Sequence, residues 1–293
     1  MPPFLQPALL APPPALEITD EEFGKLKSAR PILSAAFSLE ENYDLLIGNY
    51  VEFEKAALAI SIDSVARVRF DYEDMFELKA DMNRRAVNFL SSARLFLDQI
   101  LQRVGKIGGN TSEVKRAMSG EYDQLFEYRF MEALRNHVQH SGSAVHSLTV
   151  GGGWDKERQY KEFALEIMTV RHYLEEDGSF KKATLNECPE KVDLLLAARR
   201  YVESLSLVHD VARQVTKTLV EEARVIFDAA ISKYVKYSNA SPIGLTAYPS
   251  SLANREDGVA IFLQWDDVRL KLVKKNRSLK NLSKTIFAST SRT

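Results

Sequence analysis

Cysteine and long apolar runs are the features that this sequence most clearly lacks. Cys188 is the single cysteine in 293 residues, so an internal disulfide framework is excluded, and such a composition is typical of a reducing compartment. No apolar run reaches the roughly 18 residues that a membrane span needs. The apolar start of the chain is interrupted by prolines and has no positive charge before Lys25, unlike a signal peptide. We therefore expect a cytoplasmic protein outside the membrane, with residues 1–16 as a flexible, Pro-rich leader.

Several enzyme motifs are also missing. The sequence contains no Gly-x-Ser-x-Gly, no Gly-rich dinucleotide turn and no protein-kinase motif, which argues against those enzyme classes. The glycines at 105–109 lack the spacing and the Lys-Ser/Thr pair of a P-loop. Cys188 has acidic residues on both sides, and acidic neighbours raise the pKa of a thiol and disfavour a nucleophilic role. We expect no cofactor.

The charges are distributed unevenly, although the net charge is only −1. Residues 1–267 contain all 40 acidic and 31 of the 39 basic side chains, a net charge of −9, whereas residues 268–293 contain 8 basic side chains and no acid. This basic tail can neutralise the phosphate groups of a nucleic acid. It can equally fold back on the acidic remainder of the chain.

Apolar residues at helical spacing predict a mainly α-helical fold. Thr19 and Glu22 form a capping box that starts a short helix, and Pro31 is expected to interrupt the chain after it. Ser38 is then the expected N-cap of a helix that runs to about residue 60. Further helices are expected at about 76–104, from 112 or 122 to 140, and at 190–237. The last is longer than a small bundle needs, so it either packs across the bundle or serves a dimer.

A β-hairpin is expected directly after the helix that ends at residue 140. Residues 147–150 favour a strand, three glycines follow, and residues 163–170 alternate apolar and polar side chains. The hairpin accordingly covers about residues 147–170. Two segments stay undecided: residues 61–75 form either an extended link or a short strand, and residues 259–273 can add one or two strands.

The helix that ends at His140 carries the densest group of reactive side chains in the chain. Arg135, Asn136, His137 and His140 lie within six positions and precede Ser141-Gly142, a good helix stop. Arginine binds phosphate strongly, and the imidazole group titrates nearer to neutral pH than any other side chain. This turn is therefore the best candidate site in the sequence.

The three histidines around this helix end do not form a convincing metal site. His137 falls on the apolar helix face with Phe130 and Leu134, and we interpret it as a hydrogen-bonded core histidine. His137, His140 and His146 lack the four-residue spacing of a helical metal pair, and no Asp or Glu lies between them. We expect no metal.

The Arg-Asn-His motif, by which we mean Arg135, Asn136 and His140, is spread around its helix. At about 100° per residue, Asn136 and His140 share one flank, whereas Arg135 and His140 are separated by roughly 140°. Arg135 and His140 can therefore converge in only two ways. Either the helix loosens at His140 and Arg135 reaches around it, or a second copy of the chain supplies part of the site.

Arg135-Asn136, three further residues and His140 resemble the signature of HEPN domains, which is an Arg, a polar residue, a short spacer and a His. The resemblance covers about residues 38–148 and at its widest 38–237. It implies a helical bundle with the motif near the end of a helix, and a homodimer in which both motifs face one cleft. We thus expect three parts. Residues 1–16 are the leader, residues 17–237 are a HEPN-like helical domain that includes the hairpin, and residues 238–293 are a loop with a basic extension.

The resemblance also implies an activity, because many HEPN members cleave RNA without a metal. We expect a metal-independent endoribonuclease, a toxin or defence effector, that uses the 2′-hydroxyl of RNA as nucleophile. His140 would remove its proton, Arg135 would stabilise the charge on the phosphate, and Asn136 would position one of them. The alternative is a non-catalytic HEPN-like module that binds RNA, a nucleotide or a protein partner. Without the resemblance, Arg135 and His140 are more simply read as groups that bind helix carbonyls or pair with acids.

One position departs from the family pattern. Some HEPN toxins carry a Tyr two residues after the His, which a partner nucleotidyltransferase modifies with AMP, whereas this sequence has Gly142 there. We do not expect control by that modification. An antitoxin or a nucleotidyltransferase remains a candidate binding partner.

Overall fold

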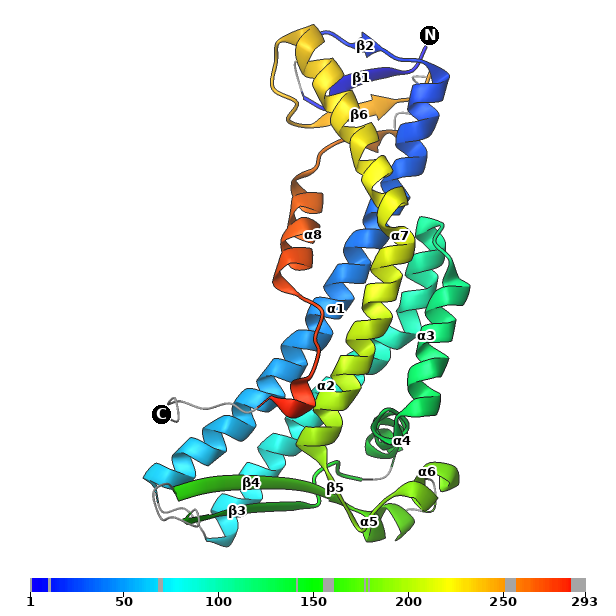
Figure 1. The fold of residues 1–293 in the computed structure, drawn as a ribbon. Helices are drawn as coiled ribbons and strands as arrows, with labels where there is room; N and C mark the ends of the chain where they lie inside the picture. Colours follow the sequence, from blue (N-terminus) through cyan, green and yellow to red (C-terminus); the bar gives the residue numbers. More distant parts are fainter. Residues whose placement is uncertain are drawn as a thin grey trace. The chain divides into compact units, whose positions relative to one another are not determined.

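The structure is a computed structural model that describes residues 2–9, 12–67, 71–140, 142–154, 161–176, 178, 180–250 and 257–285, without the side chains of residues 161, 162 and 164. It is mainly helical, as the sequence predicts (Figure 1). The helices are α1 (Asp20–Ala66), α2 (Tyr72–Ile107), α3 (Thr111–Gln124), α4 (Phe126–His140), α5 (Arg171–Glu176), α6 (Lys182–Glu187), α7 (Leu194–Ser238), α8 (Gln264–Lys275) and the 3₁₀ helix η2 (Leu282–Lys284). The strands are β1 (Phe4–Pro7), β2 (Leu16–Glu17), β3 (Ser147–Trp154), β4 (Lys161–Val170), β5 (Lys191–Asp193), β6 (Leu245–Tyr248) and β7 (Val259–Ala260). Within the described residues, every helix is too short or too polar to cross a bilayer.

The chain folds into two compact units, each assembled from segments that are distant in the sequence. Unit 1 consists of residues 1–41, 99–114 and 211–277, and unit 2 consists of residues 42–98, 115–210 and 278–293. The helices α1, α2 and α7 contribute segments to both units. This division differs from the expected single helical domain with a C-terminal extension, because the pairing of distant segments leaves no mark in local composition.

Unit 1 contains a four-stranded antiparallel sheet in the order β2-β1-β6-β7, beside the N-terminal end of α1 and the C-terminal end of α7 (Figure 1). Phe4 of β1 pairs with Tyr248 of β6, and Leu5 is fully buried. The prediction of a flexible leader is therefore wrong for the described part of residues 1–16. The apolar residues of this segment belong to the core, and their pairing partner lies near the other end of the chain.

Helix α1 continues through Pro31, so the predicted interruption at Pro31 and the N-cap at Ser38 are wrong. A proline inside a helix costs about 3 kcal/mol, since it removes one backbone hydrogen bond and crowds the preceding turn. The burial of apolar side chains before and after Pro31 offsets this cost. These side chains are Leu26, Ala29, Leu33 and Ala36. The capping box is confirmed, because Thr19 Oγ1 accepts the N–H of Glu22 at 3.1 Å and Glu22 accepts the N–H of Thr19 at 2.8 Å.

Residues 259–273 add one short strand, as the sequence allows, but most of the segment is helical. Only Val259–Ala260 is a strand, and α8 follows it. The acidic first turn and basic last turn of α8 complement the helix dipole. Asp266 is fully buried and accepts from Arg224 and, at 2.5 Å, from Arg269. At Arg269, the basic tail therefore pairs with an acid of its own chain, Asp266.

Unit 2 is built on an aromatic core between its segments of α1, α2 and α7. Tyr43 stacks on His209 with ring centroids 3.9 Å apart, and Phe89 lies 6.2 Å from Tyr201. Arg199 of α7 makes two hydrogen bonds to Glu54 of α1, at 2.7 and 2.8 Å. The predicted helix at 190–237 is confirmed as the continuous helix α7.

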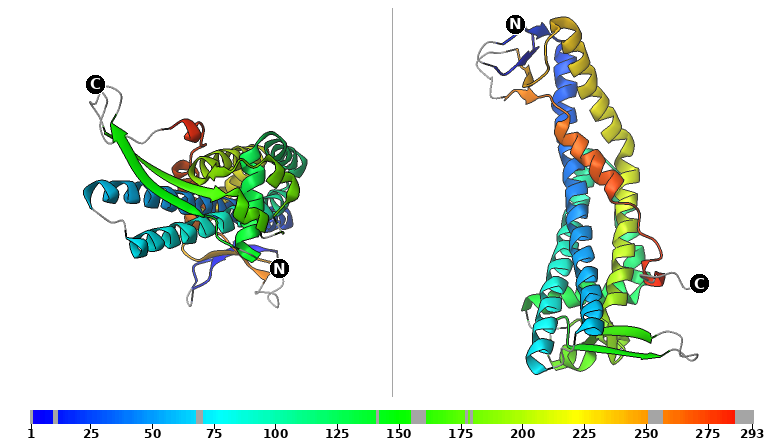
Figure 2. Two further views of the ribbon diagram at one scale, coloured as in Figure 1. Left: turned by 90° about the horizontal axis from the view of Figure 1, so that it is seen from below. Right: turned by 90° about the vertical axis from the view of Figure 1, so that its left-hand side faces the viewer.

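A three-stranded antiparallel sheet, in the order β3-β4-β5, completes unit 2. The predicted hairpin is confirmed, with Ser147 paired to Met168 and Trp154 paired to Lys161. Figure 2 shows β3 and β4 across the C-terminal end of α1 and the N-terminal end of α2. Helix α1 includes Val65, so residue 65 is not in a strand, and the remaining candidate strand positions at 68–70 lie outside the described residues.

The helix that was expected to reach His140 is two helices, α3 and α4, separated at Leu125. Arg129 explains the interruption, because its Nη1 donates to the carbonyl oxygens of Tyr122 and Asp123 at 2.7 and 2.9 Å. These carbonyls at the end of α3 therefore gain hydrogen bonds from a side chain. The chain can then turn, and α4 starts in a new direction.

The strand β1 gives a test of the packing in unit 1. We predict that Leu5→Ala lowers the free energy of unfolding by about 2–5 kcal/mol, because it leaves a cavity at a fully buried position. Leu9→Ala is the matched control, since Leu9 is 51% exposed, and its effect should stay within about 0.5 kcal/mol. Denaturant unfolding measures both. Equal effects of the two substitutions would contradict the placement of the first strand in the core.

Candidate functional site

The first half of α4 is fixed by polar and aromatic contacts within unit 2. Glu132 accepts a hydrogen bond from the Tyr201 hydroxyl and pairs with Arg94 at 3.2 Å. The ring of Tyr128 lies 5.2 Å from that of Tyr201, and Arg200 pairs with Glu127 at 2.7 Å. These contacts to α2 and α7 place the C-terminal turn of α4, which carries the Arg-Asn-His motif.

Arg135 is the unusual side chain of this turn. It is partly buried, its Nη1 donates to Asn136 Oδ1 at 3.0 Å, and it makes no ion pair with any described carboxylate. Its Nε is buried and finds no hydrogen-bond acceptor among the described residues. A guanidinium that is partly desolvated without an anion is destabilised, so this group favours the arrival of a negatively charged ligand.

The other arginines of α2, α4 and α7 in unit 2 behave differently. Each of them that the structure describes contacts a carboxylate. Arg84 and Arg85 both contact Asp81. The other pairs are Arg94 with Asp98, Arg129 with Glu187, Arg199 with Glu54, and Arg200 with Glu127. The interpretation of Arg135 as half of a structural ion pair is therefore not supported. Its cationic charge is available to a ligand.

Helix α4 remains regular through His140, and Gly142 N–H then donates to His137 O at 3.3 Å as the chain leaves the helix. His140 is exposed and shares no hydrogen bond with Arg135 within the described part of the chain. The structure thus brings Arg135 and Asn136 together but leaves Arg135 and His140 on sides that differ by roughly 140°. Of the two ways in which the motif can converge, loosening of the helix at His140 is not observed.

His137 is a core residue, as predicted. It is 4% exposed, and its ring lies 6.0 Å from that of Phe180 and 6.2 Å from that of His146. A Cβ atom at Gly142 would lie 2.7 Å from His137 Nε2. Glycine at position 142 therefore has a packing reason, because any other residue would displace the buried imidazole.

A cavity of about 480 Å³ opens beside the end of α4, and we call it the histidine cavity. His137, Gly142, Ser143 and His146 line it from the chain that ends α4, and Lys79, Tyr173 and Glu176 line it from α2 and α5. The sequence did not point to Lys79 or Tyr173. Only the fold of the hairpin, which returns the chain to α5, places them next to the motif.

His146 is held in the wall of the histidine cavity by backbone hydrogen bonds. Its Nδ1 accepts the N–H of Val170 at 3.0 Å, and the loop before it is tied to α2, because Asn83 Oδ1 accepts the N–H of Val145 at 2.8 Å. Burial, together with the neighbouring side chains of His137 and Lys79, lowers the pKa of His146 below its usual 6.5. The neutral form is thus favoured in the folded protein.

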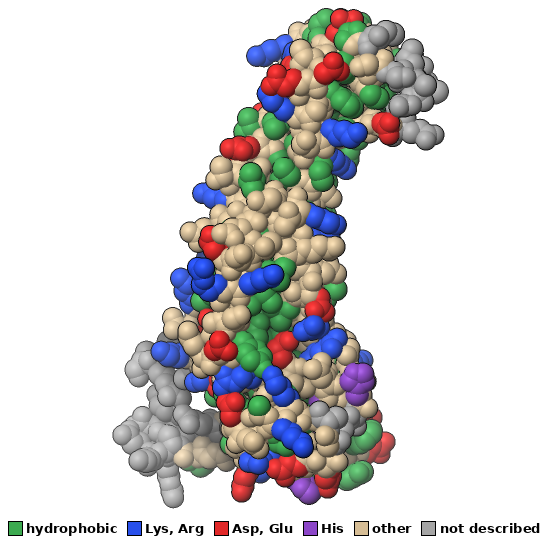
Figure 3. All heavy atoms as spheres, turned by 90° about the vertical axis from the view of Figure 1, so that its right-hand side faces the viewer, with side chains coloured by type: hydrophobic (Ala, Val, Ile, Leu, Met, Phe, Trp, Pro, Cys, Tyr) green, Lys and Arg blue, Asp and Glu red, His purple; other side chains and the backbone are tan. Residues whose placement is uncertain are grey.

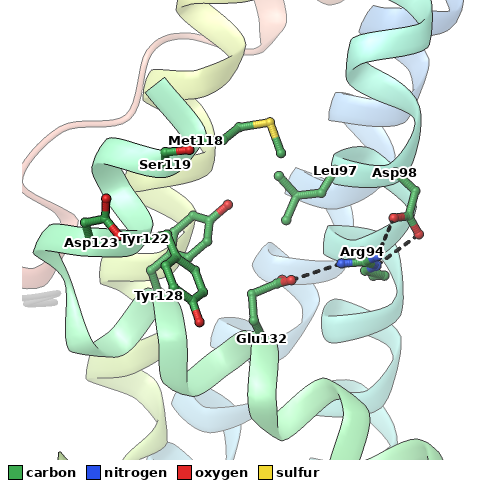
Figure 4. Close-up of a pocket in the computed structure, with 9 residues that line it drawn as sticks. All are labelled: Arg94, Leu97, Asp98, Met118, Ser119, Tyr122, Asp123, Tyr128 and Glu132. Carbon is green, nitrogen blue, oxygen red and sulfur yellow. Dashed lines mark hydrogen bonds and ion pairs between the residues drawn. The ribbon is translucent and has the colours of Figure 1, made fainter. Parts of the chain in front are cut away.

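A second cavity, of about 390 Å³, lies between α2, α3 and α4 and is shown in Figure 4. Tyr122 and Tyr128 stand on the side of α3 and α4, opposite Leu97 and Arg94 of α2. Arg94 occupies the space between Asp98 and Glu132 and pairs with both, at 2.7 and 3.2 Å.

The single arginine of this second cavity is already paired with two of the carboxylates that line it. Glu132 has two donors, Arg94 and the hydroxyl of Tyr201, and the ammonium of Lys181 lies 4.9 Å from the ring of Tyr122. Burial and the carboxylate of Glu132 raise the pKa of Tyr128, so its hydroxyl stays protonated. We therefore assign the stronger ligand site to the turn of Arg135 and to the histidine cavity, where Arg135 and Lys79 pair with no described carboxylate.

The surface around α4 is mixed in charge. Figure 3 looks onto the side of unit 2 that includes α3, α4 and α6, and there Lys and Arg side chains alternate with Asp and Glu side chains. No group of three or more His, Cys, Asp or Glu side chains among the described residues is arranged to hold a metal ion. Cys188 is buried, and burial raises the pKa of its thiol to about 11.

Comparison with known proteins adds no relative from which residue roles can be taken. No family model, no curated protein and no solved structure matches this chain. The HEPN resemblance therefore stays a prediction from Arg135, Asn136 and His140.

The lowered pKa of His146 predicts how stability depends on pH. Since the folded protein favours neutral His146, the unfolded chain binds the proton first as the pH falls below about 6.5, and stability is lost from there down to the folded pKa. We expect the free energy of unfolding to fall between pH 7.5 and 5.5, less steeply in His146→Asn than in the wild type. Denaturant unfolding at three pH values measures both slopes. Equal slopes would show that His146 is not the group responsible.

Proposed function

We propose that this chain is a metal-independent endoribonuclease of HEPN type that acts in the cytoplasm as a toxin or defence effector. The observation that carries the proposal is the guanidinium of Arg135, which pairs with no described carboxylate and lies beside Asn136, five residues before the exposed His140. An RNA phosphate is the anion that this group would bind, because a guanidinium can hold two phosphate oxygens at once.

The residues of the motif suffice for a cleavage that uses the RNA itself as nucleophile. His140 takes the proton from a 2′-hydroxyl, and the resulting oxygen attacks the adjacent phosphorus. Arg135 stabilises the charge that develops on the phosphate oxygens, and the bond to the 5′-oxygen breaks, with that oxygen taking a proton from water, while the protonated His140 returns its proton to the solvent. Asn136 orients Arg135 through the hydrogen bond between them. The products are a 2′,3′-cyclic phosphate and a 5′-hydroxyl.

We further propose that two copies of the chain form the cleft. Because α4 is regular to its last residue, a single chain presents Arg135 and His140 on different sides. A two-fold pair juxtaposes Arg135 of one copy with His140 of the other.

A second candidate function is a HEPN-like module that binds RNA without cleaving it. The absence of any direct contact between Arg135 and His140 in one described chain favours this candidate if the chain acts alone. Both candidates use Arg135 as the phosphate ligand. They differ in whether His140 reaches the same phosphate.

Cleavage of end-labelled single-stranded RNA in excess EDTA tests the proposal. We predict that the wild type cleaves, and that Arg135→Ala and His140→Ala each reduce the rate by about 10²–10⁴-fold, because each removes one catalytic group. Gln139→Ala is the matched control: Gln139 is exposed on the same turn, and its loss should leave the rate unchanged. Unfolding of each variant measured by circular dichroism excludes a loss of fold.

Intact RNA that is nevertheless bound, with affinity reduced by Arg135→Ala, would support the binding module instead. Cleavage that persists in both Arg135→Ala and His140→Ala would remove the motif from the mechanism.

A further inference from the structure

The wall of the histidine cavity contains one lysine, Lys79, and one glutamate, Glu176, and these two do not form an ion pair with each other. Lys79 is only partly exposed and makes no ion pair with any described carboxylate. Glu176 is the one acid in the cavity wall, and it already contacts His172 Nε2 at 3.0 Å. A cation that faces a concave, partly desolvated surface without a partner attracts an anionic ligand.

His146 does not compete with Lys79 for that role. Its ring is fixed by Val170, and the neutral form is favoured because it is buried near Lys79 and His137. The imidazole is therefore part of the wall, and Lys79 is the cationic side chain that the cavity offers to a ligand. Ser143, which is exposed at the rim, adds a hydroxyl donor.

Tyr173 supplies a flat aromatic surface at the same cavity. Its side chain is 51% exposed, and its ring centroid lies 4.9 Å from that of His146 and 5.5 Å from that of His172. The two imidazoles support the tyrosine, so the ring is held in place while much of it remains accessible. Such a ring can stack on a nucleic-acid base of any sequence.

We propose that the histidine cavity binds one nucleotide of a single-stranded RNA, with Lys79 on a phosphate and Tyr173 stacked on the base. A volume of about 480 Å³ is within the usual range for small-ligand pockets. The inference rests on the proposed function, because the cavity adjoins the turn of His140: His137 and Gly142, which line it, flank that residue. It extends the substrate site from the cleaved phosphate to a neighbouring nucleotide.

Binding of a fluorescently labelled 2′-O-methyl oligoribonucleotide tests this subsite without cleavage, since the probe lacks the 2′-hydroxyl nucleophile. We predict that Lys79→Gln weakens binding. It should also make the fall of log affinity with log salt concentration less steep by about 0.7, the value for one lost phosphate contact on a single strand. Tyr173→Ala should weaken binding by about tenfold, and Tyr173→Phe should retain it, because phenylalanine keeps the stacking face.

Lys115→Gln is the matched control, since Lys115 is an exposed lysine of α3 in the same unit, and it should bind like the wild type. Thermal unfolding establishes that each variant is folded. No binding by the wild type, or equal affinities of the wild type, Lys79→Gln and Tyr173→Ala, would overturn the subsite.

The two proposals fail in different ways. Probe binding that depends on Lys79 and Tyr173, together with no cleavage of unmodified RNA, would support the subsite and remove the ribonuclease. Cleavage of unmodified RNA that is unchanged in Lys79→Gln and Tyr173→Ala, together with unchanged probe binding, would support the ribonuclease and remove the subsite.

Discussion

The contact of Tyr201 with α4 is the interaction on which the candidate site depends. Tyr201 is buried in the aromatic core of unit 2, next to Phe89, and from there it contacts Tyr128 edge to face and donates to Glu132. One side chain of α7 therefore links the hydrophobic core to the helix that carries the motif. The cost of burying its hydroxyl is offset by a charged acceptor, and that acceptor also pairs with Arg94. The direction of α4, and with it the position of Arg135, follows from this packing.

The second constraint is the regularity of α4 itself. A helix that keeps its period through His140 cannot turn Arg135 and His140 toward the same phosphate. The same regularity leaves the guanidinium of Arg135 near Asn136 and away from any described carboxylate. A cation that pairs with no described carboxylate and a histidine on another side of the same helix are what the proposed composite site between two chains requires. At a helix end with a purely structural role, we would expect such a charge to be paired.

Local chemistry made part of this structure predictable from the sequence. The capping box of Thr19 and Glu22, the hairpin at 147–170 and the burial of His137 all follow from spacing within a few residues. Long-range packing decided the rest. The pairing of β1 with β6, the continuation of α1 through Pro31 and the approach of Lys79 and Tyr173 to the end of α4 depend on residues far apart in the sequence. Periodicity cannot reveal these contacts, because the free energy that stabilises them comes from burial in the assembled fold.

A mixture of Arg135→Ala and His140→Ala chains tests most directly whether two chains share the cleft. When Arg135→Ala and His140→Ala chains are co-expressed in equal amounts, about half of the dimers contain one chain of each kind. One of the two composite sites in each such dimer has both Arg135 and His140, so the account predicts about a quarter of the wild-type rate of RNA cleavage in EDTA. If each site instead took both groups from one chain, no site in the mixture would be intact. A mixture no more active than the separate variants would contradict the shared cleft.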